Sequence, residues 1–150
     1  MKKLLLLLSL LISCDLFAVE KEVSLSYESA WNNVLQVLMA EGAMIKLSDK
    51  TSGVIQASKV HERNKSEQRS YYGDSCNPGG KIISITTNIT VVVKEVNNDR
   101  SKIIIKGKGV IQSYGNSYFL FLKTGTYDIY TNCDSNGRLE DEFLTSFSKS

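Results

Sequence analysis

A long alternating run at residues 81–96 constrains the fold of this chain more than any other feature. From Ile83 to Val93 most alternate positions are apolar and most positions between them are polar, which is the period of a β-strand with one buried face. A turn-forming stretch, Asn97-Asn98-Asp99, and a second strand-like run from Ser101 to Tyr114 come next. The sequence therefore predicts a long antiparallel hairpin with one face toward water. The residues predicted to face the core are Ile83, Ile85, Thr87, Ile89, Val91, Val93, Ile103, Ile105 and Ile111.

An amphipathic stretch that begins after Ser26 predicts the first helix. Apolar side chains recur at three- and four-residue steps from Tyr27 to Met39, and Gly42 follows as a helix stop. Ser26 has a side chain suited to the N-cap position. Trp31 lies on the apolar stripe of this helix, so we expect it to be a core residue and not a platform for a ligand.

Shorter patterns on either side of these elements complete the predicted sheet. The segments Val23–Tyr27, Ala43–Leu47 and Gly53–Val60 each have the composition of a short strand. Tyr118–Leu122 and Gly125–Asn132 predict one more strand, or two short ones around the intervening polar residues. The five apolar residues of Tyr118–Leu122 predict either an exposed adhesive patch or a strand that is covered on both faces.

A second helix is expected from near Ser135, because Leu139, Phe143 and Phe147 line one side of the remaining sequence. Together the elements predict an α+β fold. We expect a two-layer sandwich in which an antiparallel sheet of five or six strands is covered on one face by a long N-terminal helix and a short C-terminal helix.

The first 14 residues indicate the compartment. Two lysines precede an apolar run from Leu4 to Ile12, which is about half the length needed to cross a bilayer and predicts a secretory signal. The last four residues, Leu11 to Cys14, resemble the bacterial lipobox. This resemblance implies cleavage before Cys14 and attachment of lipid to its thiol. An ordinary signal that is cut after Ala18, followed by soluble export, is the alternative.

These signals divide the chain into a lipoprotein signal peptide at 1–14, a tether at 15–22 and a single α+β domain at 23–150. The expected location is the bacterial cell envelope, with the lipid holding the protein on the periplasmic side of a membrane. Asp15 resembles the signal that retains lipoproteins in the inner membrane of enteric bacteria. That rule differs between bacterial groups, so the choice between inner and outer membrane stays open.

Charge and cysteine content are consistent with an exported protein. Loss of Lys2 and Lys3 with the signal leaves 16 basic and 16 acidic residues, so no net charge favours a nucleic-acid partner. With Cys14 lipidated, Cys76 and Cys133 remain as an even pair, and we expect a disulfide between them in an oxidising compartment. Two free buried thiols are the alternative. A metal site is not expected, because the cysteines lack the short paired spacings of zinc ligands.

Two stretches carry a resemblance to known proteins. Ala30–Ser58, AWNNVLQVLMAEGAMIKLSDKTSGVIQAS, resembles the opening of many small Gram-negative envelope lipoproteins of uncharacterised function. It is also loosely similar to an accessory lipoprotein of the outer-membrane β-barrel assembly complex. Cys133–Glu140, CDSNGRLE, resembles a motif that ends some of these proteins. The resemblance implies an envelope address and a helix followed by paired strands.

No set of residues in the sequence predicts catalysis or a cofactor. His61 stands alone in a charged run, without the neighbouring nucleophile that a general base needs. Glu140, Asp141 and Glu142 fall in the first turn of the predicted C-terminal helix, where the helix dipole favours carboxylates. A hydrolase would require His61, Asp74 and these acids to converge in one cleft.

The predicted function is therefore non-catalytic. We expect an accessory module that binds another envelope protein, with candidate contact residues Tyr71 and Tyr72 in the loop that precedes the alternating run. Tyr118, Phe119 and Phe121 are the other candidates. The alternative function is a carrier of a small apolar ligand or lipid, which would need a pocket between the first helix and the sheet.

Overall fold

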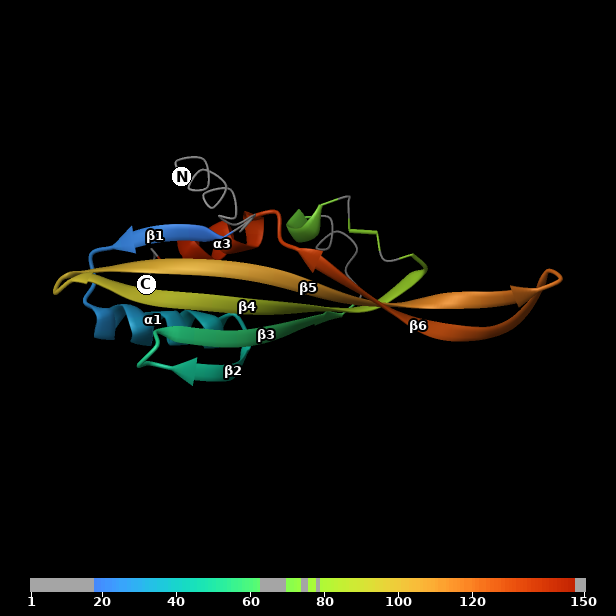
Figure 1. Cartoon of the computed structure of the whole chain (residues 1–150), viewed down its shortest axis with the longest axis horizontal. Coiled ribbons are helices and arrows are strands. Elements are labelled where there is room, and N and C mark those ends of the chain that lie inside the picture. The colour runs from blue at the N-terminus through green and yellow to red at the C-terminus, as the bar shows by residue number, and fades with distance from the viewer. Residues whose placement is uncertain (1–17, 63–69, 74–75, 78, 148–150) are drawn as a thin grey trace, which may run out of the picture.

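The computed structural model describes residues 18–62, 70–73, 76–77 and 79–147, which form a six-stranded antiparallel sheet with a few short helices (Figure 1). The strands are ordered β1-β5-β4-β3-β2, and β6 also pairs with β5. Strand β5 is long enough to have two partners on one edge: β1 pairs with its first part and β6 with its second. In chain order the elements are β1 (Val19–Val23), α1 (Tyr27–Ala40), β2 (Met44–Asp49), β3 (Val54–Glu62), β4 (Lys81–Asn97), β5 (Arg100–Phe119), β6 (Leu122–Asp134) and α3 (Arg138–Phe147).

Helix α1 begins and ends at the two capping residues that the sequence predicts. The Ser26 hydroxyl accepts a hydrogen bond from the Ser29 N–H at 3.3 Å, as an N-cap does. After the last turn, Gly42 adopts a φ of 76°, and the N–H groups of Gly42 and Ala43 bond back to carbonyls of that turn. The stop limits α1 to 14 residues, so the expectation of a long N-terminal helix was wrong.

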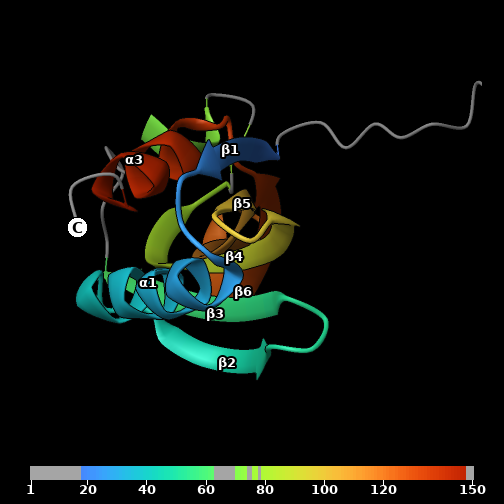
Figure 2. The same ribbon diagram turned by 90° about the vertical axis from the view of Figure 1, so that its left-hand side faces the viewer.

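Helices α1 and α3 lie on the same face of the sheet (Figure 2). Between them and the sheet is the larger hydrophobic cluster, which we call the main core. Trp31 is 4% exposed within it, which confirms that this residue is a core residue. The strand residues that reach the main core alternate along β3, β4 and β5, as a sheet with one covered face requires. The buried residues of the main core are Ala30, Trp31, Val34, Val37, Leu38, Ala43, Ile55, Ala57, Ile89, Val91, Val93, Ile103, Ile105, Phe143, Leu144 and Phe147.

Strand β1 lies inside the segment expected to be a tether. Its sequence, VEKEV, alternates, and its odd positions are half-buried while the two glutamates are exposed. Residues Val19 to Val23 pair with β5 from Ile105 to Ser101. The tether expected at 15–22 therefore ends before Val19, and most of the predicted strand Val23–Tyr27 instead links β1 to α1.

Strands β4 and β5 each differ from the prediction in one detail. A register shift in β4 between Ile82 and Ser84 turns Ile82, 6% exposed, toward the interior in place of the predicted Ile83. Strand β5 continues past Tyr114 to Phe119, and the chain then reverses at Leu120-Phe121. The segment predicted as a strand at Tyr118–Leu122 is thus the end of a hairpin.

The outer part of the β5–β6 hairpin extends beyond both helices (Figure 1). Between this hairpin and the main core lies a second buried cluster, which we call the junction cluster. Its residues are Tyr72, Cys76, Ile82, Ile85, Ile111 and Cys133. None of the helices in the described part of the chain is long and apolar enough to cross a bilayer.

Candidate functional site

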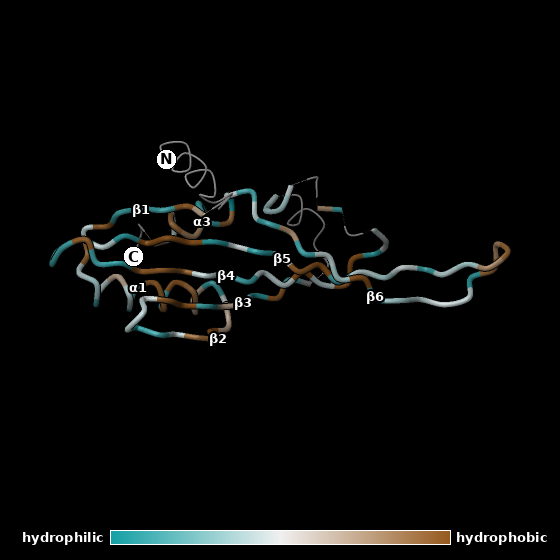
Figure 3. The backbone as a smooth tube through the Cα atoms, in the orientation of Figure 1, coloured by the Kyte–Doolittle hydropathy of each residue, from teal (hydrophilic) through white to brown (hydrophobic). Residues whose placement is uncertain are grey.

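The tip of the β5–β6 hairpin, which we define as Tyr118–Leu122, is the most exposed apolar segment of the described chain. The exposed fractions of its five side chains run from 64% at Tyr118 to 99% at Phe121. Figure 3 shows this segment as an apolar end on an otherwise mixed hairpin. Contiguous exposed apolar residues on a globular protein commonly mark a contact site. Of the two alternatives from the sequence, the exposed patch is therefore the correct one.

The turn within the tip has an unusual backbone. Leu120 and Phe121 have φ angles of 45° and 69°, a left-handed conformation that is the signature of a type I′ hairpin turn. Such turns normally contain Asn-Gly, because left-handed φ costs other residues roughly 1–2 kcal/mol each. The position thus holds two large apolar residues where the backbone favours small ones, and strain of this kind is concentrated at functional sites.

Cross-strand contacts support the hairpin behind its tip. A Cβ atom on Gly115 would lie 2.3 Å from the Tyr127 ring, so the ring covers that glycine directly. The Thr124 hydroxyl donates a hydrogen bond to the Ser117 hydroxyl at 3.1 Å. A shallow groove beside this part of the hairpin is lined by Lys81, Tyr114, Tyr127 and their neighbours. These contacts matter because an isolated two-stranded ribbon is only marginally stable in water.

At the other end of the hairpin, a buried carboxylate closes a gap in the sheet. On one edge of β5, pairing with β1 ends at Ile105 and pairing with β6 begins at Lys108, so neither strand covers Gly107. Glu140 Oε1 accepts a hydrogen bond from the Gly107 N–H at 2.6 Å, and Oε2 accepts one from the Ser135 hydroxyl at 2.5 Å. The Ser135 N–H donates to the Gly107 carbonyl at 3.3 Å.

This arrangement gives Glu140 a structural role. The residue is fully buried, and each of its carboxylate oxygens accepts one of these hydrogen bonds. A side chain at Gly107 would press against the carboxylate, because a Cβ there would lie 3.1 Å from Oε1. Asp74, another member of the hydrolase hypothesis, lies outside the described residues. The geometry gives that hypothesis no support.

The predicted contact residue Tyr72 is buried, so this prediction was wrong. Its side chain is 3% exposed, and its hydroxyl shares a 2.6 Å hydrogen bond with the Thr87 hydroxyl. Its ring lies against Gly109, where a Cβ would approach to 2.6 Å. Tyr71 is half-buried beside it and donates a hydrogen bond to Glu142 Oε2 at 2.9 Å. Both tyrosines therefore fix the loop to the sheet and to α3.

Cys76 and Cys133 lie within the junction cluster, with their Cα atoms 5.7 Å apart, and the structure joins them in a disulfide. The bond ties the loop before β4 to the end of β6. Cys14, the expected lipid attachment site, lies outside the described residues. Within the described segments, no group of three or more His, Cys, Asp or Glu residues has the arrangement of a metal site.

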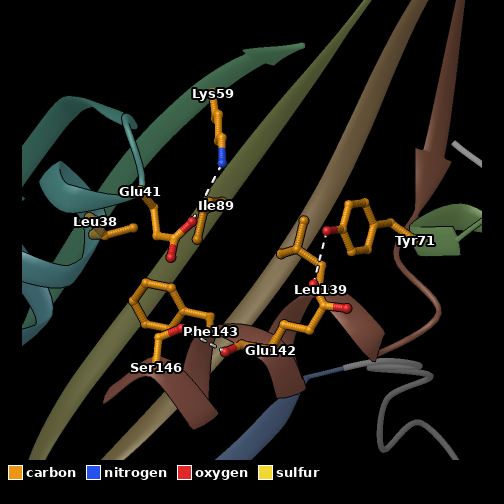
Figure 4. Close-up of a pocket in the computed structure, with 9 residues that line it drawn as sticks. All are labelled: Leu38, Glu41, Lys59, Tyr71, Ile89, Leu139, Glu142, Phe143 and Ser146. Carbon is orange, nitrogen blue, oxygen red and sulfur yellow. Dashed lines mark hydrogen bonds and ion pairs between the residues drawn. The ribbon is translucent and has the colours of Figure 1, made fainter. Parts of the chain in front are cut away.

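A small cavity lies where the carrier hypothesis would need one (Figure 4). Its volume is about 140 Å³, and Leu38, Ile89 and Phe143 are among its apolar lining residues. The mouth is polar, with Glu41 and Lys59 paired at 3.5 Å. Ligand pockets usually measure roughly 300–1,000 Å³. This cavity therefore has too little room for an acyl chain.

Glu142 lines the same cavity. Among the described carboxylates it is the one that is partly buried and also has a shifted pKa. Partial burial alone would raise its pKa, but hydrogen bonds from Arg138 and Tyr71, together with the Arg138 charge, outweigh burial and lower the pKa. Arg138 Nε donates to Oε1 at 2.8 Å. A carboxylate held ionised by two donors is suited to fixing α3 and the loop, and not to serving as a general acid near neutral pH.

The sequence predicted an exposed patch at Tyr118–Leu122 as one of two alternatives and did not predict the geometry of the turn or the role of Glu140. The turn lacks the Asn-Gly signal that usually identifies such hairpins. Glu140 was identified as a residue of the first helical turn, whereas its partner Gly107 is 33 positions away. Comparison of the chain with protein-family models, curated proteins and solved structures found no match, so the site is assigned on its geometry alone.

Proposed function

We propose that this protein is a lipid-anchored, non-catalytic accessory module of the bacterial envelope, and that the β5–β6 hairpin is the element that binds another envelope component. The proposed anchor is Cys14. The fold that we propose is the two-layer α+β sandwich expected from the sequence, which is supported by the packing of both helices on one face of the sheet.

The single observation that carries this proposal is the exposed tip. Five consecutive apolar side chains project from the body on a ribbon that no other described element covers, and Phe121 is 99% exposed at its end. Such a segment is costly in water and has no structural role in the main core. A binding role accounts for its retention, and Tyr118, Phe119 and Phe121 are the contact residues.

The envelope address rests on the N-terminal sequence. The lipobox resemblance at Leu11–Cys14 supports anchoring. The Cys76–Cys133 pair and the absence of a membrane-spanning helix among the described residues are compatible with a secreted or periplasmic protein. A lipid carrier function is not proposed, because the cavity between helix and sheet has too little room for an acyl chain.

Site-specific photocrosslinking in intact cells tests the binding element. A photoreactive amino acid is placed at Phe121 in the full-length chain, and the control carries it at Val60, which is 64% exposed on β3. We expect adducts, with protein or with lipid, from position 121 and not from position 60. Equal adducts from the two positions, or none from either, would contradict the proposal.

Fractionation tests the anchor separately. Replacement Cys14→Ala should abolish incorporation of a palmitate analogue and remove the lipid-dependent attachment of the chain to membranes. A wild-type product that lacks the label and begins at Val19 would show that the protein is exported without lipid.

A further inference from the structure

We propose that the hairpin tip inserts into the interfacial region of a lipid bilayer. This inference rests on the proposed function, because it names the component that the hairpin binds. Leu120 and Phe121 would enter the boundary between headgroups and acyl chains, while the rest of the hairpin stays in the headgroup layer and in water.

The order of side chains along the hairpin matches the order of layers at a membrane surface. Phe119–Leu122 at the very end has no polar side-chain atom. Tyr118 and Lys123 face each other in the ladder just behind these residues, with exposed Tyr127 a few positions further back. Tyrosine and lysine are the side chains that mark membrane interfaces, because each has an apolar body and a polar end.

The length of the apolar segment fits shallow insertion. At ~3.3 Å per residue, the turn lies ~7 Å beyond the Tyr118–Lys123 pair. Interfacial segments bury their apolar side chains about 5–10 Å into the headgroup and acyl boundary. Phe119 and Leu122 pair with each other on either side of the turn. Few backbone N–H and C=O groups would therefore enter the bilayer without a hydrogen-bond partner.

Charge on the hairpin favours anionic lipid. Lys123 is the one charged residue between Tyr114 and Tyr127, and Lys81 lines the groove beside them. The nearest acid on the hairpin, Asp128, lies six residues after Leu122, ~20 Å from the tip. The end of the hairpin is thus cationic and apolar, which is complementary to a surface of anionic headgroups.

The tip suits a bilayer better than a protein pocket. Protein interfaces contain about one hydrogen bond per 100–200 Å², and these bonds fix the orientation of the partners. The residues Phe119–Leu122 offer no side-chain donor or acceptor for that purpose. A bilayer requires apolar surface at the right depth and no specific polar partner.

The position of the tip relative to the proposed anchor sets the orientation. Val19 pairs with Ile105, and Leu120 lies 15 residues further along the chain, ~50 Å at the rise of a strand. Cys14 is five residues from Val19 and can be at most ~18 Å from it. Anchor and tip can therefore contact one bilayer when the long axis of the molecule lies along the membrane surface.

Vesicle binding of the unlipidated chain tests the inference. Residues 15–150 retain every described strand and helix and both buried clusters, so the core is complete in this chain. The probes are vesicles of phosphatidylglycerol and phosphatidylethanolamine, with neutral phosphatidylcholine vesicles for comparison. We expect the chain to cosediment with the anionic vesicles.

The decisive variant combines Leu120→Asn with Phe121→Gly. Asn-Gly is the preferred pair for this turn, so the hairpin should form at least as well while the apolar end is removed. Binding to anionic vesicles should fall at least about 100-fold, because two large apolar side chains no longer leave water. Lys123→Gln should weaken binding about 5-fold on anionic vesicles and leave binding to neutral vesicles unchanged. The matched control, Val60→Thr, should bind like the wild type.

Depth is measured with a tryptophan introduced by Phe121→Trp. Its emission should shift to the blue on binding and be quenched by lipids brominated near the headgroup end of the acyl chain, whereas buried Trp31 should not respond. Failure of the wild type to bind vesicles, or equal binding by the Asn-Gly variant, would overturn the inference. A protein adduct from position 121 in cells would then still support the proposed function, whereas no adduct would contradict both proposals.

Discussion

The half of the sheet beneath α1 and α3 and the half formed by the outer β5–β6 hairpin share strand β5, which has opposite surroundings in the two places. Ile103 and Ile105 are fully buried under the helices, whereas Phe119 on the same strand is 68% exposed. In the covered half β5 has a neighbouring strand on each edge, and in the outer hairpin β6 is its only partner among the described strands. Apolar residues at one end of β5 therefore stabilise the fold, and those at the other end remain available for contact.

This contrast shows that the residues that stabilise the fold and the residues that are available for binding lie on different parts of strand β5. Free energy of unfolding should be concentrated where buried apolar contacts are dense, and the hairpin tip should open locally at little cost. Substitutions can then change one property without the other. The predictions that follow test how complete this separation is.

The largest effect is expected at the junction between the two halves. Replacing Cys76 or Cys133 with alanine should lower the free energy of unfolding by about 4 kcal/mol, because the bond closes a loop with a sequence separation of 57. Urea unfolding followed by Trp31 fluorescence measures the loss. The double variant should lose no more than either single one, and additive losses would show that the two cysteines act independently.

The next prediction compares one substitution in the two halves. Phe143→Ala should cost about 3 kcal/mol, because this ring is 6% exposed in the main core. Phe121→Ala, at a side chain that is 99% exposed, should change stability by less than about 0.5 kcal/mol. Thermal and urea unfolding of both variants provide the measurement. Similar losses from the two would mean that the hairpin tip is part of the cooperative fold.

The sequence predicts the covered half well because its signals are local. Alternation along β4 and β5 identifies Val91, Ile103 and Ile105 as core residues, and all three are fully buried. Ser26 and Gly42 predict both ends of α1 through their own side-chain and backbone preferences. The same two residues set the length of the helix, because the segment between them holds 14 helical residues and not a long helix.

The outer hairpin and its junction were harder to predict because their determinants are distant or atypical. Neither Leu120 nor Phe121 is a residue type that favours a turn. The sequence therefore predicted the break between strands at the polar residues between Leu122 and Gly125. The polar loop around Tyr72 predicted an exposed side chain. The residue is buried because its ring occupies the space above Gly109, which lies on a strand far along the chain. No periodicity or local propensity contains that information.

A third, smaller effect is expected at Glu140, which joins the two halves through Gly107. Glu140→Gln should cost about 2 kcal/mol, because an amide NH₂ cannot accept and one buried donor is left without a partner. The control Asp141→Asn changes an exposed carboxylate of the same turn and should cost only a few tenths of a kcal/mol. Urea unfolding compares them, and equal small losses would show that the Glu140 bonds contribute little.

The smallest effect concerns Glu142, at the edge of the covered half. Its pKa in the folded protein is lowered from an ordinary value of 4.5, because the Arg138 and Tyr71 hydrogen bonds and the Arg138 charge outweigh partial burial. The stabilisation is therefore fully present above the pKa of the unfolded chain and is lost as pH falls through the lower folded value.

We expect Glu142→Gln to lose a few tenths of a kcal/mol at pH 7 and nothing well below pH 4, because the carboxylate is about half exposed and its ion pair is screened by water. Measuring unfolding of wild type and variant across this range isolates Glu142 from Glu28 and Asp49, whose pKa values are also lowered. Tyr71→Phe should remove part of the same difference. A difference between wild type and Glu142→Gln that does not vary with pH would mean that Glu142 stabilises α3 through packing and not through its charge.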